Sequence, residues 1–236
     1  QFIILSVCGL GYSGSLAYVG ATSTVLAVLI SLRWDVEIMV NKMQALSESL
    51  QEASVTIGFM TLLILLVNVI VGSPISIHIF IAAIAIAIHE LLVSILFVNS
   101  FFYMYAFFRT LPAFALISLA LLGFKPEIIW PLSFLLSASC LTIYFADLIK
   151  SSVFNINLER IKLISILPKL YAAITATVFM FVSALFVVII SLNYGDEYAG
   201  LWSNSIRIFN SIIIFLLATL LPFTLKKLGD TNVEYE

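Results

Sequence analysis

Long apolar runs, separated by short polar or Gly/Pro-containing breaks, dominate the pattern along the chain. A helix needs about 20 residues to cross the hydrocarbon core of a bilayer, because it rises about 1.5 Å per residue. Residues 2–10 are apolar but too short to cross. The pattern therefore predicts an all-α, polytopic transmembrane bundle with one partial helix and about seven full spans, at residues 14–32, 53–72, 78–98, 104–123, 127–149, 170–192 and 199–223.

The stretch 79–108 admits two interpretations. It forms either one long tilted helix or two helices with a break at Val98-Asn-Ser. We favour the break, because the charged loops then alternate between the two sides of the bundle.

Composition agrees with a membrane location. Of the 236 residues, 62% are hydrophobic and 10% are charged, and the mean hydropathy is +1.17. Soluble domains are nearer half apolar and a quarter charged. This composition excludes nucleic-acid-binding modules, disulfide-rich secreted scaffolds and ordinary cytosolic enzymes. The net charge of −2 says little about a partner.

The placement of the basic residues predicts an orientation. With residues 2–10 taken as the first run, nine of the eleven basic residues follow the even-numbered runs, including Arg109 at the boundary between the fourth and fifth. Lys125 lies on the other side, and Arg207 lies within a run. Cytoplasmic loops are enriched in Lys and Arg. Residues 33–52, residues 150–169 and the C-terminus are therefore expected to be cytoplasmic.

The two cytoplasmic segments, 33–52 and 150–169, are longer than a connection requires. Each is either an interfacial amphipathic helix or a solvated connector. The second segment also has six runs before it and two after it. It therefore predicts a boundary between two bundles, with a first bundle at 1–149, a connector at 150–169 and two further helices at 170–236, which a two-lobed family would read as a first transmembrane lobe and the first two helices of a second.

Ionisable residues inside apolar runs are the candidates for function, because they are costly in lipid and usually face the bundle interior or a water-filled path. His89 and Glu90 lie in the middle of the fourth run, where Glu90 either takes up a proton or pairs with a neighbouring helix. Arg207 either faces an aqueous cavity that suits an anionic group such as phosphate, or extends to the nearer interface. Asp147, near a helix end, is expected to be a solvated boundary residue.

Motifs of catalysis are missing from the sequence. The two histidines do not form an H-x4-D pair, and there is no G-x-S-x-G, HExxH, acidic metal-binding array or glycine-rich phosphate loop. We therefore expect a transporter or channel rather than an enzyme, with no catalytic residue, cofactor or metal.

Two stretches carry a resemblance to a known family. Residues 14–38 end in Leu-Arg-Trp-Asp-Val-Glu-Ile, and an acidic loop follows. This is similar to the second helix of bacterial polysaccharide flippases and its cytoplasmic signature, with Arg33 and Asp35 at the charged positions. Residues 194–208 (YGDEYAGLWSNSIRI) are similar to the entry of the eighth helix, with Arg207 at the recurring basic position.

The resemblance implies membership of the multidrug/oligosaccharidyl-lipid/polysaccharide exporter superfamily. Its members have twelve or more helices in two lobes around a V-shaped cavity. It also implies a function: flipping undecaprenyl-diphosphate-linked oligosaccharide units, such as O-antigen units, across the bacterial inner membrane by alternating access, often coupled to H⁺ or Na⁺. Under this interpretation Arg207 and Arg109 are candidates for the diphosphate, and Glu90 and His89 for ion or proton coupling.

Other functions stay open at this point. One is a small-molecule or drug exporter of the same superfamily. Another is an integral-membrane enzyme of envelope polysaccharide synthesis, such as a polymerase or acyltransferase, and a third is a non-catalytic membrane scaffold. The expected partners are a lipid-linked oligosaccharide and membrane lipid, with no nucleic acid. Because the predicted spans amount to one lobe plus two helices, the chain is expected to be a fragment of a two-lobed transporter.

Overall fold

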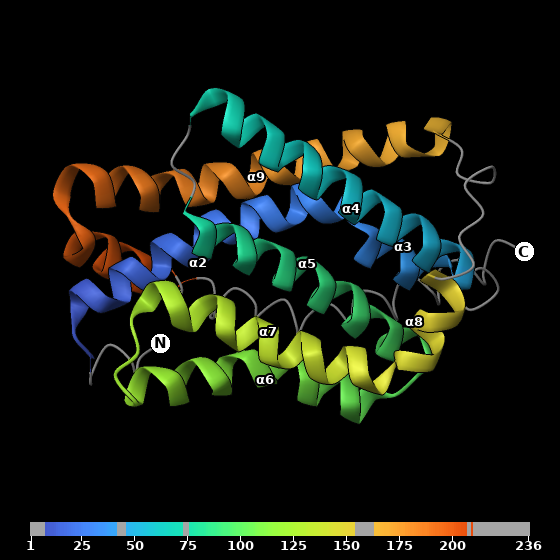
Figure 1. Ribbon diagram of the computed structural model, residues 1–236. Coiled ribbons are helices and arrows are strands. Elements are labelled where there is room, and N and C mark those ends of the chain that lie inside the picture. The colour runs from blue at the N-terminus through green and yellow to red at the C-terminus, as the bar shows by residue number, and fades with distance from the viewer. Residues whose placement is uncertain (1–7, 42–45, 73–75, 154–162, 207–208, 210–236) are drawn as a thin grey trace, which may run out of the picture.

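The computed structural model describes residues 8–41, 46–72, 76–153, 163–206 and 209. Within these ranges every regular element is a helix, which confirms the all-α prediction (Figure 1). Residues 196–206 form a further helical stretch after the labelled helices. The labelled helices are α2 (Leu10–Ser31), α3 (Trp34–Asn41), α4 (Leu46–Val71), α5 (Ile77–Val98), α6 (Phe102–Leu121), α7 (Pro126–Tyr144), α8 (Ala146–Val153) and α9 (Leu163–Tyr194).

The long helices lie roughly along one axis and alternate in direction. Helices α2, α5 and α7 run one way, and α4, α6 and α9 run the other way (Figure 1). Arg33 and Lys150 therefore lie at one end of the bundle and Lys125 at the opposite end. This matches the predicted alternation of charge, and the side of the membrane that each end faces stays a prediction.

Helix α5 is the centre of the bundle and packs against α2, α3, α6 and α7. Of its membrane-length window, 78% is buried. The sequence of α5 places four alanines and many aliphatic residues on all of its faces. A helix that is apolar all round is typically buried. The small side chains Ala82 and Ala83 are fully buried, as are Val93, Ile95 and Leu96 further along.

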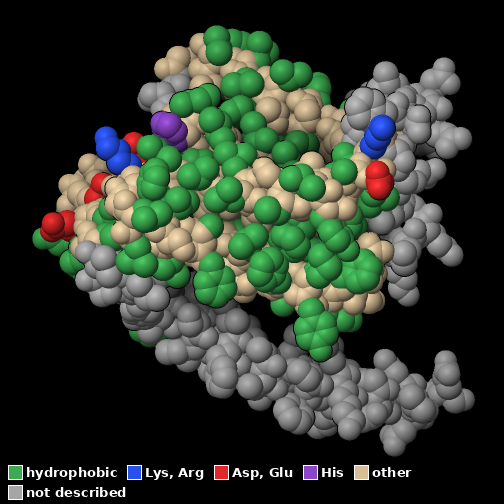
Figure 2. Space-filling view, turned by 60° about the horizontal axis from the view of Figure 1, so that its bottom comes forward, with side chains coloured by type: hydrophobic (Ala, Val, Ile, Leu, Met, Phe, Trp, Pro, Cys, Tyr) green, Lys and Arg blue, Asp and Glu red, His purple; other side chains and the backbone are tan. Residues whose placement is uncertain are grey.

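The outer helices present large apolar side chains to the surroundings. Only 17% of the window Ser49–Ile70 in α4 is buried, and 22% of Phe102–Leu121 in α6. Figure 2 shows a broad hydrophobic band on one face, with charged side chains gathered toward its two ends. Such a band is typical of helices in contact with lipid.

Five of the described helices are long and apolar enough to cross a membrane, as expected for a multi-pass membrane protein. They are Leu10–Ser31, Ser49–Ile70, Ile77–Val98, Phe102–Leu121 and Pro126–Tyr144. They agree within a few residues with the second to sixth predicted runs. The predicted break after Val98 is confirmed, because α5 ends there and α6 begins at Phe102.

Three boundaries differ from the predictions. The run 127–149 is two helices, because α7 ends at Tyr144 and α8 starts at Ala146. Arg109 lies two turns inside α6 rather than at a boundary, since the break comes earlier, at 99–101. The segment 150–169 includes the first residues of α9, which begins at Leu163.

Of the two long connecting segments, 33–52 is largely helical. It contains α3 and the start of α4. Trp34 is 1% exposed and Ile38 is 2% exposed, because α3 packs against α4 and α5. The part of this segment that α3 forms is therefore packed against the bundle rather than solvated. Of the second segment, residues 154–162 lie outside the described residues.

The backbone at the start of α2 is in direct contact with the backbone of the helical stretch 196–206. A Cβ atom added to Gly14 would lie 1.7 Å from the carbonyl oxygen of Asp196, and one added to Gly200 would lie 2.5 Å from that of Leu10. Nearby, the Asn204 side-chain amide donates to Ser13 Oγ at 3.2 Å. Glycine at position 14 therefore allows the two backbones to touch.

Candidate functional site

Four charged side chains that the sequence singled out line one cavity of about 230 Å³. Arg33 and Asp35 come from the region between α2 and α4, Glu90 from α5, and Arg109 from α6. We call this cavity the charged pocket. It is also lined by Thr24, Ala27, Val28, Ser31, Ile86 and Ala87.

A tight turn after α2 positions Arg33 at the pocket. Leu32 and Arg33 both have left-handed backbone angles, with φ of 45° and 60°. This conformation costs roughly 1–2 kcal/mol for a residue with a side chain. Leu32 and Trp34 are nevertheless buried, and the backbone N–H of Arg33 donates to Ser31 Oγ at 3.3 Å. Burial of the neighbouring side chains thus holds a strained turn that reverses the chain beside α5.

An ion pair joins α5 to α6 across the pocket. Arg109 Nη1 donates to Glu90 Oε2. The Arg109 side chain is 47% exposed and that of Glu90 is 29% exposed, so both charges retain access to the surroundings. This arrangement supports the interpretation in which Glu90 pairs with a neighbouring helix. It also places a predicted diphosphate ligand, Arg109, in contact with a predicted coupling residue.

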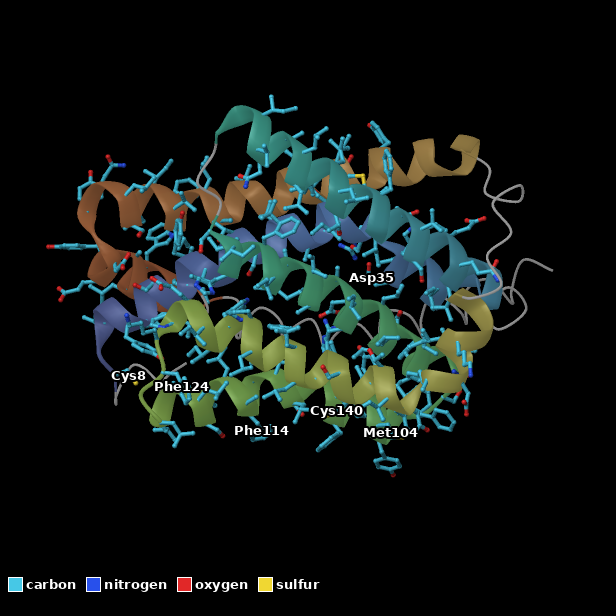
Figure 3. The ribbon with its side chains drawn as sticks, viewed as in Figure 1. Cys8, Asp35, Met104, Phe114, Phe124 and Cys140 are labelled. Atoms are coloured by element: carbon cyan, nitrogen blue, oxygen red, sulfur yellow. The ribbon has the colours of Figure 1, made fainter. Side chains whose placement is uncertain are left out.

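Asp35 is in the first turn of α3 (Figure 3), and Arg33 Nε lies 3.5 Å from its Oδ1 atom. Burial raises the pKa of the Asp35 carboxyl above its ordinary value. The Arg33 guanidinium opposes this rise, and the Glu90 carboxylate adds to it. Asp35 therefore holds a proton more readily than an exposed aspartate. The pocket contains two guanidinium groups, which stay charged, and two carboxyl groups, so its net charge depends on whether a carboxyl is protonated.

His89 does not line the charged pocket. Its ring is 1% exposed and packs edge-on against Phe134 of α7, with ring centroids 5.4 Å apart. Its Nε2 atom lies 3.1 Å from the Phe108 carbonyl oxygen. A helical carbonyl normally accepts from the N–H four residues later, but position 112 is Pro and has no N–H.

His89 therefore satisfies the carbonyl that Pro112 leaves without a donor. The carbonyl only accepts, so Nε2 carries a hydrogen and Nδ1 faces Glu90, whose Oε1 atom is 3.9 Å away. This contact accounts for a histidine in an apolar helix by packing. A coupling role for His89 stays a prediction.

Two other candidates from the sequence lie elsewhere. Arg207, the first predicted diphosphate ligand, lies outside the described residues. Asp147 is exposed in the first turn of α8, as expected for a boundary residue. Among the described residues, no group of three or more His, Cys, Asp or Glu side chains is placed to hold a metal ion.

The sequence missed the polar lining that α2 contributes. Thr24 and Ser31 face the charged pocket, seven residues and about two helical turns apart. That heptad spacing of hydroxyl residues in an apolar run was a usable signal. The link between His89 and Pro112 was not visible in this way, because it depends on how α5 packs against α6.

Comparisons with known proteins found no match: no protein-family model, no curated protein and no solved structure is similar to this chain. The resemblance to polysaccharide flippases therefore rests on the residues of the sequence alone.

Proposed function

We propose that this protein is a membrane transporter that flips a lipid-linked oligosaccharide diphosphate across the bilayer. The observation that carries the proposal is the charged pocket. It gathers two arginines and two carboxylates from three parts of an otherwise apolar bundle. Charges in such a setting are costly unless they are paired or face a polar path.

The chemistry of the pocket suits a phosphate group. Guanidinium groups bind phosphate oxygens through paired hydrogen bonds that match in geometry. Arg109 and Arg33 are paired with Glu90 and Asp35. A diphosphate competes with these carboxylates, so protonation of Asp35, whose pKa burial raises, favours its binding. Substrate binding is in this way linked to proton uptake.

This linkage supplies the difference in affinity that alternating access needs. A ligand shifts a conformational equilibrium only when it binds one state better than the other. A pocket in which Asp35 is protonated binds the diphosphate more tightly than one in which both ion pairs are intact. At about 230 Å³ the charged pocket is below the usual size of organic ligand sites, so it fits a head group and not a sugar chain.

Reconstitution of the full-length protein in liposomes tests the proposal. The substrate is an undecaprenyl-diphosphate-linked sugar carrying a fluorescent label, and its accessibility on each leaflet is measured. Arg109→Ala should slow flipping about tenfold or more, the factor expected for a lost hydrogen bond to a charged group. Arg109→Lys should restore part of the rate.

The double variant Arg109→Ala/Glu90→Gln separates transport from folding. It removes both partners, so no charge is left unpaired in the bundle, and the protein should keep its wild-type stability but not its transport. Lys125→Ala is the matched control, because Lys125 is exposed at the opposite end of the bundle. Arg207→Ala, predicted from the sequence, is measured in the same assay.

Unchanged flipping in both Arg109→Ala and Glu90→Gln would overturn the site. If the wild type moves a cationic dye but no lipid diphosphate, the protein is a small-molecule exporter instead. If it polymerises or acylates the lipid-linked sugar without moving it, the protein is an envelope enzyme.

A further inference from the structure

A second polar cavity, of about 350 Å³, lies at the end of the bundle opposite Arg33. The starts of α2, α5 and α7 and the end of α9 meet there (Figure 1). We call it the distal pocket. The side chains that give it its chemistry are Ser15, Tyr18, His78, Glu127, Ser191 and Asp196.

Hydrogen bonds fix the polar lining in place. The carboxylate of Asp196 accepts from Ser15 Oγ at 2.5 Å and from Ser191 Oγ at 2.6 Å. Ser76 caps the start of α5, where its Oγ accepts from the His78 backbone N–H at 3.3 Å. Three different parts of the chain therefore hold the pocket in shape.

We propose that the distal pocket binds a neutral sugar residue of the transported oligosaccharide, an inference that rests on the proposed function. Its volume falls within the range of about 300–1,000 Å³ that is usual for organic ligands, whereas the charged pocket is smaller. A sugar hydroxyl both donates and accepts. The lining offers the Tyr18 hydroxyl and the His78 imidazole, which do both, and serine and carboxylate oxygens that accept.

The lining also argues against other ligands. Of the described residues around the distal pocket, none is Lys or Arg, so a phosphate would meet Glu127 and Asp196 without a cation to balance its charge. A bare cation needs acceptors alone and far less space. Tyr18 adds an aromatic side chain, whose apolar body and polar tip suit the mixed surface of a sugar ring.

The two pockets act on different parts of one substrate. Both border α2, and Ser15 of the distal pocket is twelve residues from Ala27 of the charged pocket. At 1.5 Å per residue these two residues are roughly 18 Å apart, and the nearest lining residues of α2, Val19 and Thr24, are roughly 8 Å apart. The charged pocket therefore recognises the diphosphate that every substrate shares. The distal pocket recognises a sugar of the attached chain and so determines specificity.

Binding is tested directly with free sugars. Full-length protein in lipid nanodiscs is mixed with a panel of neutral hexoses, N-acetylhexosamines and one uronic acid, and saturation-transfer NMR reports contact. Neutral sugars should give signals, and the uronic acid should give weaker ones because of Glu127 and Asp196. Glu127→Gln should weaken binding about tenfold.

Glu197→Gln is the matched control, because Glu197 is next to Asp196 but does not line the pocket. It should leave sugar binding unchanged. Ser15→Ala should also weaken binding, because it removes a hydroxyl that orients Asp196. Equal signals for wild type, Glu127→Gln and Ser15→Ala would overturn the inference. It would also be overturned by no signal from any sugar, or by binding of Na⁺ in place of sugars.

Transport measurements separate this inference from the proposed function. If the wild type flips lipid-linked oligosaccharides but Glu127→Gln changes neither the rate nor the preference among sugars, the distal-pocket inference fails alone. If sugars bind and no lipid diphosphate is moved, the proposed function fails and the sugar site remains.

Discussion

The hydrogen bond between His89 and the Phe108 carbonyl predicts that His89→Leu and Pro112→Ala will not have independent effects. His89→Leu keeps the volume of the side chain roughly constant but removes the donor, so a buried acceptor loses its partner. That loss costs about 1–3 kcal/mol. For a chain of this size each kcal/mol changes Tm by about 2–4 °C. The single variant should therefore unfold about 2–12 °C below the wild type.

Pro112→Ala should rescue this loss. Alanine at position 112 supplies the backbone N–H that α6 lacks, so the Phe108 carbonyl gains its normal helical donor. In that background His89→Leu should cost less by about 1–3 kcal/mol. Thermal unfolding in nanodiscs, followed by circular dichroism, gives the four Tm values of the double-mutant cycle.

Pro131→Ala in α7 is the matched control for this cycle, because the carbonyl that Pro131 leaves without a donor belongs to Glu127. Combined with His89→Leu it should give additive effects. Additivity within about 0.5 kcal/mol in the cycle with Pro112 would refute the role assigned to His89.

Two further variants test packing and protonation. Gly14→Ala places a Cβ against the Asp196 carbonyl and should lower Tm by several degrees, since overpacking costs about 1–3 kcal/mol. The control is Gly58→Ala in α4, which has open space around it and should raise Tm or leave it unchanged. Equal Tm shifts in the two variants would contradict the close contact at Gly14. The raised pKa of Asp35 means that the folded protein binds this proton more tightly than the unfolded chain, so its contribution to stability is complete below the ordinary pKa and is lost as the pH rises through the raised value. The Tm of Asp35→Asn relative to that of the wild type should therefore be highest near neutral pH and should fall as the pH is lowered toward about 4. Parallel curves of Tm against pH would show that Asp35 does not titrate in this way.

The main helices could be predicted because apolar runs of membrane length leave few alternatives. The second to sixth runs coincide with α2, α4, α5, α6 and α7 within a few residues, and the break after Val98 was predicted from the charge pattern. The end of α7 could not be predicted. Phe145 interrupts a run whose residues are apolar on both sides, so the pattern shows no boundary there.

The candidate site could be predicted in its residues but not in its pairing. Arg33 and Asp35 were predicted from a signature, Glu90 from its place in an apolar run, and Arg109 as a basic residue at a run boundary. All four line one pocket. That Arg109 pairs with Glu90 depends on the register between α5 and α6, which periodicity does not define. The distal pocket was missed for a similar reason, because its polar residues lie at helix ends, where polar residues are ordinary.

The contact between Gly14 and the backbone near Asp196 has a mechanical consequence. It pins α2 near its first turn, while Ser31, at the other end of the helix, is seventeen residues and roughly 25 Å away. If a rigid helix is held near one end, a rotation about that point displaces the other end most. A tilt of about 10° around this fulcrum would displace the Ser31 end by about 4 Å and leave the Ser15 end nearly still. A rotation of α2 about this contact would therefore be amplified at the charged pocket, where it would also have to displace the buried side chains of Ile30 and Leu32.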